Sequence, residues 1–317
     1  MHVTKLAAGG ERYYLDSVAA GAEDLRAPGL EPDGRWMGRG AIGLDLVGRV
    51  GAYDLGAVLA GADPSTGERL NPAQALVRVV GFDLTFSAPK SVSVLFGLAG
   101  YERGLQVRAG HDAAVADALG YLEREAVTAL RQSEGERWSV PTEGVVAAGF
   151  LHHTSRAADP HLHTHVLVAN LVKGDDGRWS AVDGRGLYAH GTTALALYQC
   201  RLRQELVERL GLAWGPVVNG VANLEGIDRA VLSMFSQRRI QLEAELQAWR
   251  KVPAIPGAAA PAFGPTMGSG GDPTENRHQP AGPRALELAA LATRPAKDQS
   301  RSLQSLQVEW RRRAAEA

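Results

Sequence analysis

The sequence contains 317 residues, of which 45% are hydrophobic, enough to bury the core of one large domain or two smaller ones. Its 34 Lys and Arg residues nearly balance 35 Asp and Glu residues, which excludes a uniformly basic surface, so a nucleic-acid partner must bind a local basic face. A single cysteine, Cys200, excludes an internal disulfide and a thiolate metal cluster, and no apolar stretch reaches membrane-span length, so we expect a cytoplasmic protein without membrane insertion.

The N-terminal region begins with a predicted short helix over residues 9–22, in which Tyr13 and Tyr14 are adjacent. Residues 23–40 are polar and interrupted by Gly and Pro, which predicts a loop. The first strand is predicted over Val77–Phe86, because this segment is rich in β-branched and aromatic residues.

Helices are predicted after this strand, up to Leu98, and over Tyr101–Arg131, where apolar residues recur at helical spacing. Two apolar runs with alternating histidines, Val145–Thr154 and His163–Val172, predict paired strands. A helix over Thr192–Leu210 and a charged helix over Asp228–Arg250 follow.

The C-terminal part contains a segment, residues 253–283, with seven of the sixteen prolines and six glycines. Such a composition buries too little surface to order itself. We therefore expect a first domain over 1–250, a flexible insertion over 251–284 and a helical segment over 285–317.

Five histidines, His152, His153, His161, His163 and His165, lie within fourteen positions. On a strand His163 and His165 point the same way, and a neighbouring strand can supply a third imidazole from His152 or His153. Three His ligands with an open position are typical of a catalytic metal site. A lone histidine is more often a surface or core residue, but this grouping favours metal; spacing does not choose among the five.

Tyr13 and Tyr14 are the second candidate feature. Adjacent residues on a helix lie about 100° apart, so only one of them can face a given site. A tyrosine can be a covalent nucleophile when its phenol is activated and a cation neutralises the phosphoryl charge. The alternative is that both rings pack against the sheet.

Asp83 is the third candidate, because it interrupts an apolar strand and burying an unpaired carboxylate is costly. Its partner could be a metal-bound imidazole that it orients, or the hydroxyl of a tyrosine. The alternative is a buried salt bridge with Arg or Lys.

These features occur in segments that resemble one family. The segments are Tyr13-Tyr14, GRWMGRG at 34–40, GFDLTFSAPKSVS at 81–93, HHTSRAADPHLHTHVLVAN at 152–170 and LATRPAKD at 291–298. They are similar to the MobF-type (TrwC- and TraI-like) relaxases of conjugative plasmids, within the HUH endonuclease superfamily.

The resemblance implies that His152, His163 and His165 are the metal ligands, because the family pattern is His-x-Thr-Ser-Arg followed by Leu-His-Thr-His. It implies that Tyr13 is the nucleophile and that Asp83 is an acid/base or a ligand-orienting carboxylate. The implied cofactor is a divalent metal, with Mg or Mn favoured and Zn or Ni as alternatives.

The implied reaction is attack by the Tyr13 oxygen on single-stranded DNA at an origin of transfer, leaving a 5′-phosphotyrosine and a free 3′-hydroxyl. Accessory relaxosome proteins and a type IV secretion coupling protein are implied partners. Lys90, Arg156, Arg178 and Arg185 flank the motifs and are candidate phosphate contacts.

The sequence also departs from the family pattern. Family members often carry a second tyrosine pair soon after the first, whereas Glu23-Asp24 is followed here by Leu25-Arg26, so Tyr14 is the obvious spare. No G-x-x-x-x-G-K-[ST] motif occurs, so no helicase domain is expected in these residues. The 253–283 segment is longer than expected in the part of the family that closes over DNA.

We therefore predict an α+β fold, a palm-like antiparallel sheet with helices on one face and a helical C-terminal extension. The predicted function is a metal-assisted, DNA-nicking relaxase. Two alternatives are a decayed relaxase that binds origin DNA without cutting it and a three-His zinc hydrolase, although the sequence has no H-E-x-x-H motif.

Overall fold

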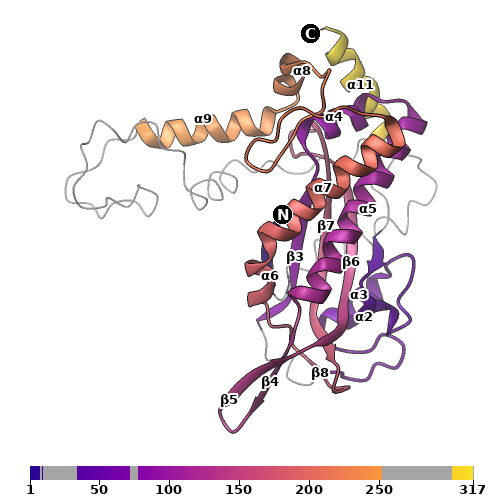
Figure 1. Ribbon diagram of the computed structural model, residues 1–317, viewed down its shortest axis with the longest axis vertical. Coiled ribbons are helices and arrows are strands. Elements are labelled where there is room, and N and C mark those ends of the chain that lie inside the picture. The colour runs from indigo at the N-terminus through magenta and orange to yellow at the C-terminus, as the bar shows by residue number, and fades with distance from the viewer. Residues whose placement is uncertain (8, 10–33, 72–77, 252–301, 317) are drawn as a thin grey trace.

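The computed structural model describes residues 1–7, 9, 34–71, 78–251 and 302–316, and its core is an antiparallel sheet between helices (Figure 1). The predicted α+β class is thereby confirmed. The six-stranded sheet has the order β1-β3-β7-β6-β2, with β8 paired to β7. Its strands are β1 (His2–Ala7), β2 (Arg35–Met37), β3 (Val79–Ser87), β6 (Thr142–Thr154), β7 (Pro160–Gly174) and β8 (Trp179–Ser180).

The two histidine-bearing segments form the neighbouring strands β6 and β7, as predicted, and both strands are longer than predicted. Their register places His152 opposite His163, and Phe150 opposite His165. Opposite residues of an antiparallel pair point to the same face. All four side chains therefore share one face of the sheet.

Helices α5 (Tyr101–Glu125) and α7 (Gly191–Leu210) lie side by side across the other face (Figure 1). The apolar residues of α5 that are buried there, together with alternate residues of the central strands, include Val115, Leu119 and Leu122, whereas Leu105 is exposed. The helix predicted over Tyr101–Arg131 is six residues shorter than expected, because the chain from Ala129 onward forms a strand instead.

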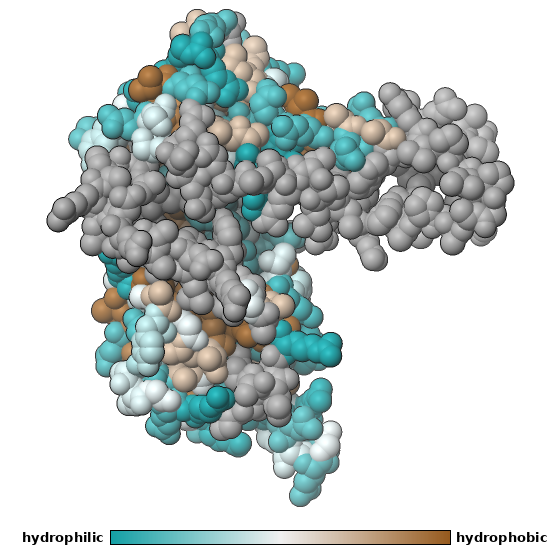
Figure 2. Space-filling model, turned by 180° about the vertical axis from the view of Figure 1, so that it is seen from behind, coloured by the Kyte–Doolittle hydropathy of each residue, from teal (hydrophilic) through white to brown (hydrophobic). Residues whose placement is uncertain are grey.

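Two further helices, α2 (Arg39–Ile42) and α3 (Ala52–Leu59), cover the histidine-bearing face, so the prediction of helices on one face only was wrong. Strand β2 and helix α2 also occupy part of the predicted loop 23–40. Apolar surface is exposed in the lower half of that side of the molecule, around α2 and α3 (Figure 2).

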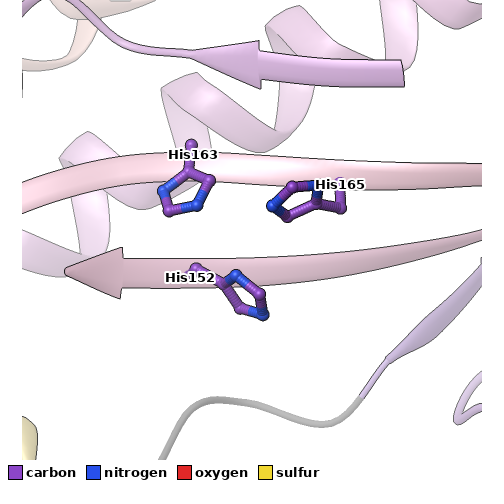
Figure 3. Close-up of side chains that lie close together, drawn as sticks. All are labelled: His152, His163 and His165. Carbon is purple, nitrogen blue, oxygen red and sulfur yellow. The ribbon is translucent and has the colours of Figure 1, made fainter. Parts of the chain in front are cut away.

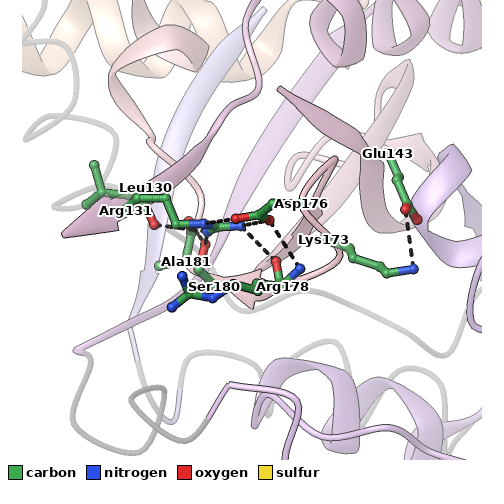
Figure 4. A network of polar contacts seen from close by, with 8 residues as sticks. All are labelled: Leu130, Arg131, Glu143, Lys173, Asp176, Arg178, Ser180 and Ala181. Atoms are coloured by element: carbon green, nitrogen blue, oxygen red, sulfur yellow. Dashed lines mark hydrogen bonds and ion pairs between the residues drawn. The ribbon is translucent and has the colours of Figure 1, made fainter. Parts of the chain in front are cut away.

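The strands β4 (Ala129–Ser133) and β5 (Glu136–Val140) form a separate two-stranded ribbon that projects from the end of the sheet (Figure 1). Arg131, in the middle of β4, is buried and donates two hydrogen bonds of 2.6 and 2.9 Å to Asp176 and one of 2.6 Å to Ser180 (Figure 4). This network ties the ribbon to the turn between β7 and β8. A short helix, α6 (Arg185–Ala189), precedes α7.

The opposite end of the sheet carries α4 (Lys90–Leu98), α8 (Arg229–Met234), α9 (Gln237–Lys251) and α11 (Leu303–Ala315). Helix α4 confirms the run predicted up to Leu98, and α11 confirms a helical C-terminal extension. The single charged helix predicted over 228–250 is two helices, because the chain breaks at Phe235, which is fully buried against the α11 residue Trp310.

Trp310 also explains a glycine in α4. A Cβ atom on Gly97 would lie 2.8 Å from the Trp310 ring and 3.0 Å from Pro160. Glycine at this position therefore allows α11 to approach α4 and the start of β7.

Three predictions lie outside the described residues: the N-terminal helix over residues 9–22, nearly all of the 251–284 insertion, and the motif at 291–298. The domain boundaries stay predictions. Among the described helices, none is long and apolar enough to cross a membrane.

Candidate metal centre

Three imidazoles meet on one face of the central strand pair. His152 comes from β6, and His163 and His165 come from β7 (Figure 3). One ring nitrogen from each lies within 4.8 Å of the others. The ring centroids are 5.1 to 5.2 Å apart. The period-two alternation and the strand register together place all three side chains in this group.

The orientation of His165 is fixed by a carboxylate on the next strand. Its Nδ1 lies 2.9 Å from Oδ2 and 3.0 Å from Oδ1 of Asp83 on β3. The Thr85 hydroxyl lies 3.3 Å from the same nitrogen. Because Nδ1 is engaged by these oxygens, Nε2 is the nitrogen that can bind a metal, and the carboxylate raises its basicity.

The second β7 imidazole, His163, is oriented by a backbone group. Its Nδ1 lies 2.8 Å from the carbonyl oxygen of His161 and donates a hydrogen bond to it, which again directs metal binding to Nε2. Burial, followed by the neighbouring imidazoles of His161, His152 and His165, holds the pKa of His163 well below its usual range. A neutral imidazole is the form that binds a metal.

The donor set therefore fits a divalent metal. Three imidazoles are a frequent ligand set for catalytic zinc and suit several other transition metals. Two of them have the outer hydrogen-bond partners that are usual for metal-bound histidine. This arrangement supplies three ligands and leaves further coordination positions for a substrate oxygen.

The structure also separates this group from the other two histidines of the cluster. His153 points to the opposite face and stacks on Phe96, with 5.2 Å between ring centroids. His161 lies beside His163, with 4.4 Å between ring centroids, but outside the group of three. Burial lowers the pKa of His161 to about 4.

A cleft of about 490 Å³ adjoins His163 and contains four basic side chains. Two of them, Lys90 and Arg156, were candidate phosphate contacts, and the other two, Arg238 and Arg239 of α9, were missed because a charged helix gives no sign of where it will pack. Lys90 donates a 3.0 Å hydrogen bond to the Pro160 carbonyl, and its burial lowers its pKa. The cleft is positively charged next to the three imidazoles.

The other candidate residues are not brought to this group. Arg178 is exposed in the turn between β7 and β8, at the far end of the sheet. Arg185 is paired with Asp183 at 2.6 Å and lies by the C-terminal end of α5, where its neighbour Gly186 packs on Ala126. Tyr13 and Tyr14 lie outside the described residues.

Comparison with known proteins assigns the chain to a family. A sequence model of the TrwC relaxase family matches residues 7–317, which is nearly the whole chain. The chain belongs to the TrwC relaxase family.

Relatives of this TrwC relaxase chain agree with the assignment. The multifunctional conjugation protein TraI of Escherichia coli is 36% identical over 215 residues, which are 64% of this chain and 12% of TraI. The chain thus spans about an eighth of the length of that curated relative.

Solved structures of the conjugative relaxase TrwC match the fold closely. A metal-free complex of TrwC with OriT DNA has a TM-score of 0.78 and 27% identity, and covers 99% of this chain and 97% of the TrwC chain. A metal-bound complex has a TM-score of 0.77, 29% identity and the same coverage. Together with the donor set of this chain, these matches support a divalent metal as cofactor.

Proposed function

We propose that the chain is a site- and strand-specific DNA relaxase of conjugative transfer that cuts single-stranded DNA at an origin of transfer. The observation that carries the proposal is the group formed by His152, His163 and His165, with Asp83 behind one imidazole. The basic cleft beside it offers a place for DNA phosphates. Family membership and the TrwC complexes with OriT DNA support the substrate.

The three histidines would hold the metal, and Asp83 would orient His165. A bound divalent metal supplies positive charge to the non-bridging oxygens of the scissile phosphate. Both oxygens of Asp83 contact His165, which supports the ligand-orienting role over the role of a base for the tyrosine. We propose Mg or Mn as the resident metal, with Zn or Ni as alternatives that the same imidazoles can bind.

Tyr13 is the proposed nucleophile. Its phenolic oxygen forms a bond to phosphorus while the bond from phosphorus to the 3′ oxygen breaks. The phenolic proton passes to water, and the departing 3′ oxygen takes up a proton. The products are a 5′-phosphotyrosine and a free 3′-hydroxyl.

Family membership also motivates proposals about the setting of the protein. We propose that it acts in the cytoplasm with accessory relaxosome proteins and a type IV secretion coupling protein. We further propose that residues 1–250 and 285–317 together form the relaxase region, with 251–284 as an insertion.

The proposal is tested by trapping the covalent adduct. The wild type, Tyr13→Phe and Tyr14→Phe are each incubated with a labelled library of single-stranded DNA and Mn²⁺, and the products are separated on a denaturing gel. We expect an adduct in the wild type and in Tyr14→Phe but not in Tyr13→Phe. Mass spectrometry then locates the modified peptide.

The Tyr14 variant is the matched control, because it removes the same hydroxyl from the adjacent position. On the predicted helix the two side chains point about 100° apart, so one of them reaches the site without rotation of the helix. An adduct on Tyr14, or full activity of Tyr13→Phe, would show that the nucleophile is wrongly assigned. DNA binding without any adduct would favour the decayed relaxase.

A further inference from the structure

A buried chain of hydrogen bonds connects two helices to the strand residue between two of the proposed ligands. Thr164 lies between His163 and His165 on β7, and its side chain points to the opposite face. Its Oγ1 lies 2.8 Å from Nε2 of His111 on α5. The Nδ1 of His111 lies 2.8 Å from the hydroxyl of Tyr198 on α7.

The environment of these three side chains leaves them little freedom. His111 and Tyr198 are fully buried, and Thr164 is 6% exposed. The Tyr198 ring meets His111 edge-on, at 5.6 Å and 84°, and lies 5.6 Å from Phe86. Phe86 is the register partner of Thr164 on β3. Helix α7 thus supports the β3–β7 pair at the position of Thr164.

The protonation state of His111 suits this role. Burial, followed by nearby positive groups, lowers the pKa of His111 to about 3, so the ring is neutral. A neutral imidazole has one nitrogen that donates and one that accepts a hydrogen bond. A hydroxyl can donate or accept, so the hydroxyls of Thr164 and Tyr198 can each match the nitrogen they contact. Each polar group is therefore satisfied, and removal of one partner leaves a buried group unpaired, which is costly.

We propose that His111, Thr164 and Tyr198 are positioning residues for the metal centre. They hold the backbone at Thr164 from the face of the sheet that α5 and α7 cover. In this way they set the spacing and twist of His163 and His165, whose side chains lie on the opposite face. Metal–ligand distances in well-formed sites lie within about 0.2 Å of their usual values, so a strand that can shift holds the ion less tightly. This inference rests on the proposed function, because it presumes that the imidazoles bind a metal.

The test measures Mn²⁺ affinity of the full chain by calorimetry. Thr164→Val and Tyr198→Phe each remove one hydroxyl and keep the shape of the side chain. Thr164→Ser is the rescue variant, because it keeps the hydroxyl. Tyr121→Phe is the matched control. Tyr121 lies on α5, the helix that carries His111, and its hydroxyl lies 2.8 Å from Nδ1 of His190, as the hydroxyl of Tyr198 lies 2.8 Å from Nδ1 of His111.

We expect Thr164→Val and Tyr198→Phe to weaken Mn²⁺ binding by about ten-fold, the lower end of what the loss of an outer partner costs a metal site. Thr164→Ser and Tyr121→Phe should bind like the wild type. Melting temperatures of the metal-free proteins provide a second readout: Tyr198→Phe and Tyr121→Phe should both melt earlier, so a stability change alone does not explain the difference in affinity.

The outcomes separate the two proposals. If the wild type binds Mn²⁺ and Thr164→Val and Tyr198→Phe bind it equally well, the positioning role is wrong while the metal centre stands. If Tyr121→Phe loses as much Mn²⁺ affinity as Tyr198→Phe, the losses reflect lower overall stability, and the positioning role is likewise wrong. If the wild type itself binds no metal, the metal centre is wrong and the positioning role with it.

Discussion

Asp83 and His165 lie on neighbouring antiparallel strands and are joined by a contact of 2.9 Å between Oδ2 and Nδ1. The residue directly opposite His165 is Thr85, and Asp83 lies two positions before Thr85 on β3, on the same face. The contact is therefore diagonal across the strand pair, within reach of a short carboxylate and an imidazole. It turns the ring so that its other nitrogen faces the proposed metal.

The first prediction follows from this contact. Asp83→Asn keeps the size of the side chain and removes its negative charge, so Nε2 of His165 becomes less basic and less well oriented. We expect metal affinity to fall roughly 10- to 100-fold, measured by calorimetry. Asp183→Asn is the control, because it removes a carboxylate that pairs with Arg185 away from the imidazoles. Equal affinity in wild type and Asp83→Asn would make the carboxylate merely structural.

The second prediction separates the three proposed ligands from their neighbours. The double variant His163→Ala/His165→Ala should abolish Mn²⁺ binding and DNA cleavage while its circular dichroism spectrum stays that of the wild type. His161→Ala should keep most of the affinity, because the carbonyl that orients His163 belongs to the backbone. Loss of binding in His161→Ala, with binding retained in the double variant, would reverse the ligand assignment.

The sequence determined the positions of some of the proposed ligands and left others open. The placement of His163 and His165 on one face followed from strand alternation alone, and the strand register confirmed it. The choice of His152 over His153 depends on strand register. Strand alternation left this choice open, and the family resemblance supplied it. Alternation is local, whereas register depends on long-range pairing.

Errors arose where distant partners override local preference. Val127 and Leu130 continue the helical spacing of α5, yet the chain leaves the helix at Ala126. The buried guanidinium of Arg131 donates hydrogen bonds to the side chains of Asp176 and Ser180, which are 45 and 49 residues away in the chain, and helical geometry would not bring it there. Similarly, the charged stretch at 228–250 gave no sign that Phe235 would be buried under α11.

His111 was missed for a different reason. It lies on the apolar stripe of the predicted helix, four residues from Val107 and from Val115. A polar residue on such a stripe is a usable signal, because it needs a buried partner. The identity of the partners, Thr164 and Tyr198, depends on helix packing that spacing does not reveal.

The third prediction concerns DNA binding. Binding of a short single-stranded oligonucleotide should weaken with salt, and each phosphate contacted should add about −0.7 to the slope of the logarithm of the binding constant against the logarithm of the salt concentration. Arg156→Gln should reduce affinity and slope, because Arg156 lines the cleft beside His163. Arg178→Gln should change neither, since a short strand at the cleft cannot reach the far end of β7. A slope that is flat, or equally reduced in both variants, would contradict binding in the cleft.

The fourth prediction concerns the attachment of α11. Trp310 is fully buried, and its Nε1 donates a 2.8 Å hydrogen bond to the Ala158 carbonyl in the turn between β6 and β7. Trp310→Ala should lower the free energy of unfolding by about 3–5 kcal/mol in urea titrations. Val308→Ala on the same helix should have little effect, because Val308 is 62% exposed. Equal stability of the two variants would mean that α11 contributes nothing to the folded core.

The fifth prediction concerns pH and follows from the low pKa of His111. In the folded chain its pKa is about 3 because the ring is buried, whereas an unfolded histidine titrates near 6.5, about the model-peptide value. Below this pH the unfolded state binds a proton that the folded state does not, so the contribution of His111 to stability is complete above about pH 6.5 and is lost as the pH falls toward about 3.

Replacement of His111 by glutamine keeps a polar side chain but removes the titration. With a chelator present, the urea-derived free energy of unfolding should therefore fall less steeply between pH 6 and pH 5 in His111→Gln than in the wild type, by a difference approaching about 1.4 kcal/mol per pH unit. His2→Gln, an exposed substitution on β1, serves as the control and should follow the wild-type curve. If His111→Gln and the wild type lose stability in parallel, His111 is protonated at similar pH in both states, and the neutral hydrogen-bonded chain through α5 does not exist.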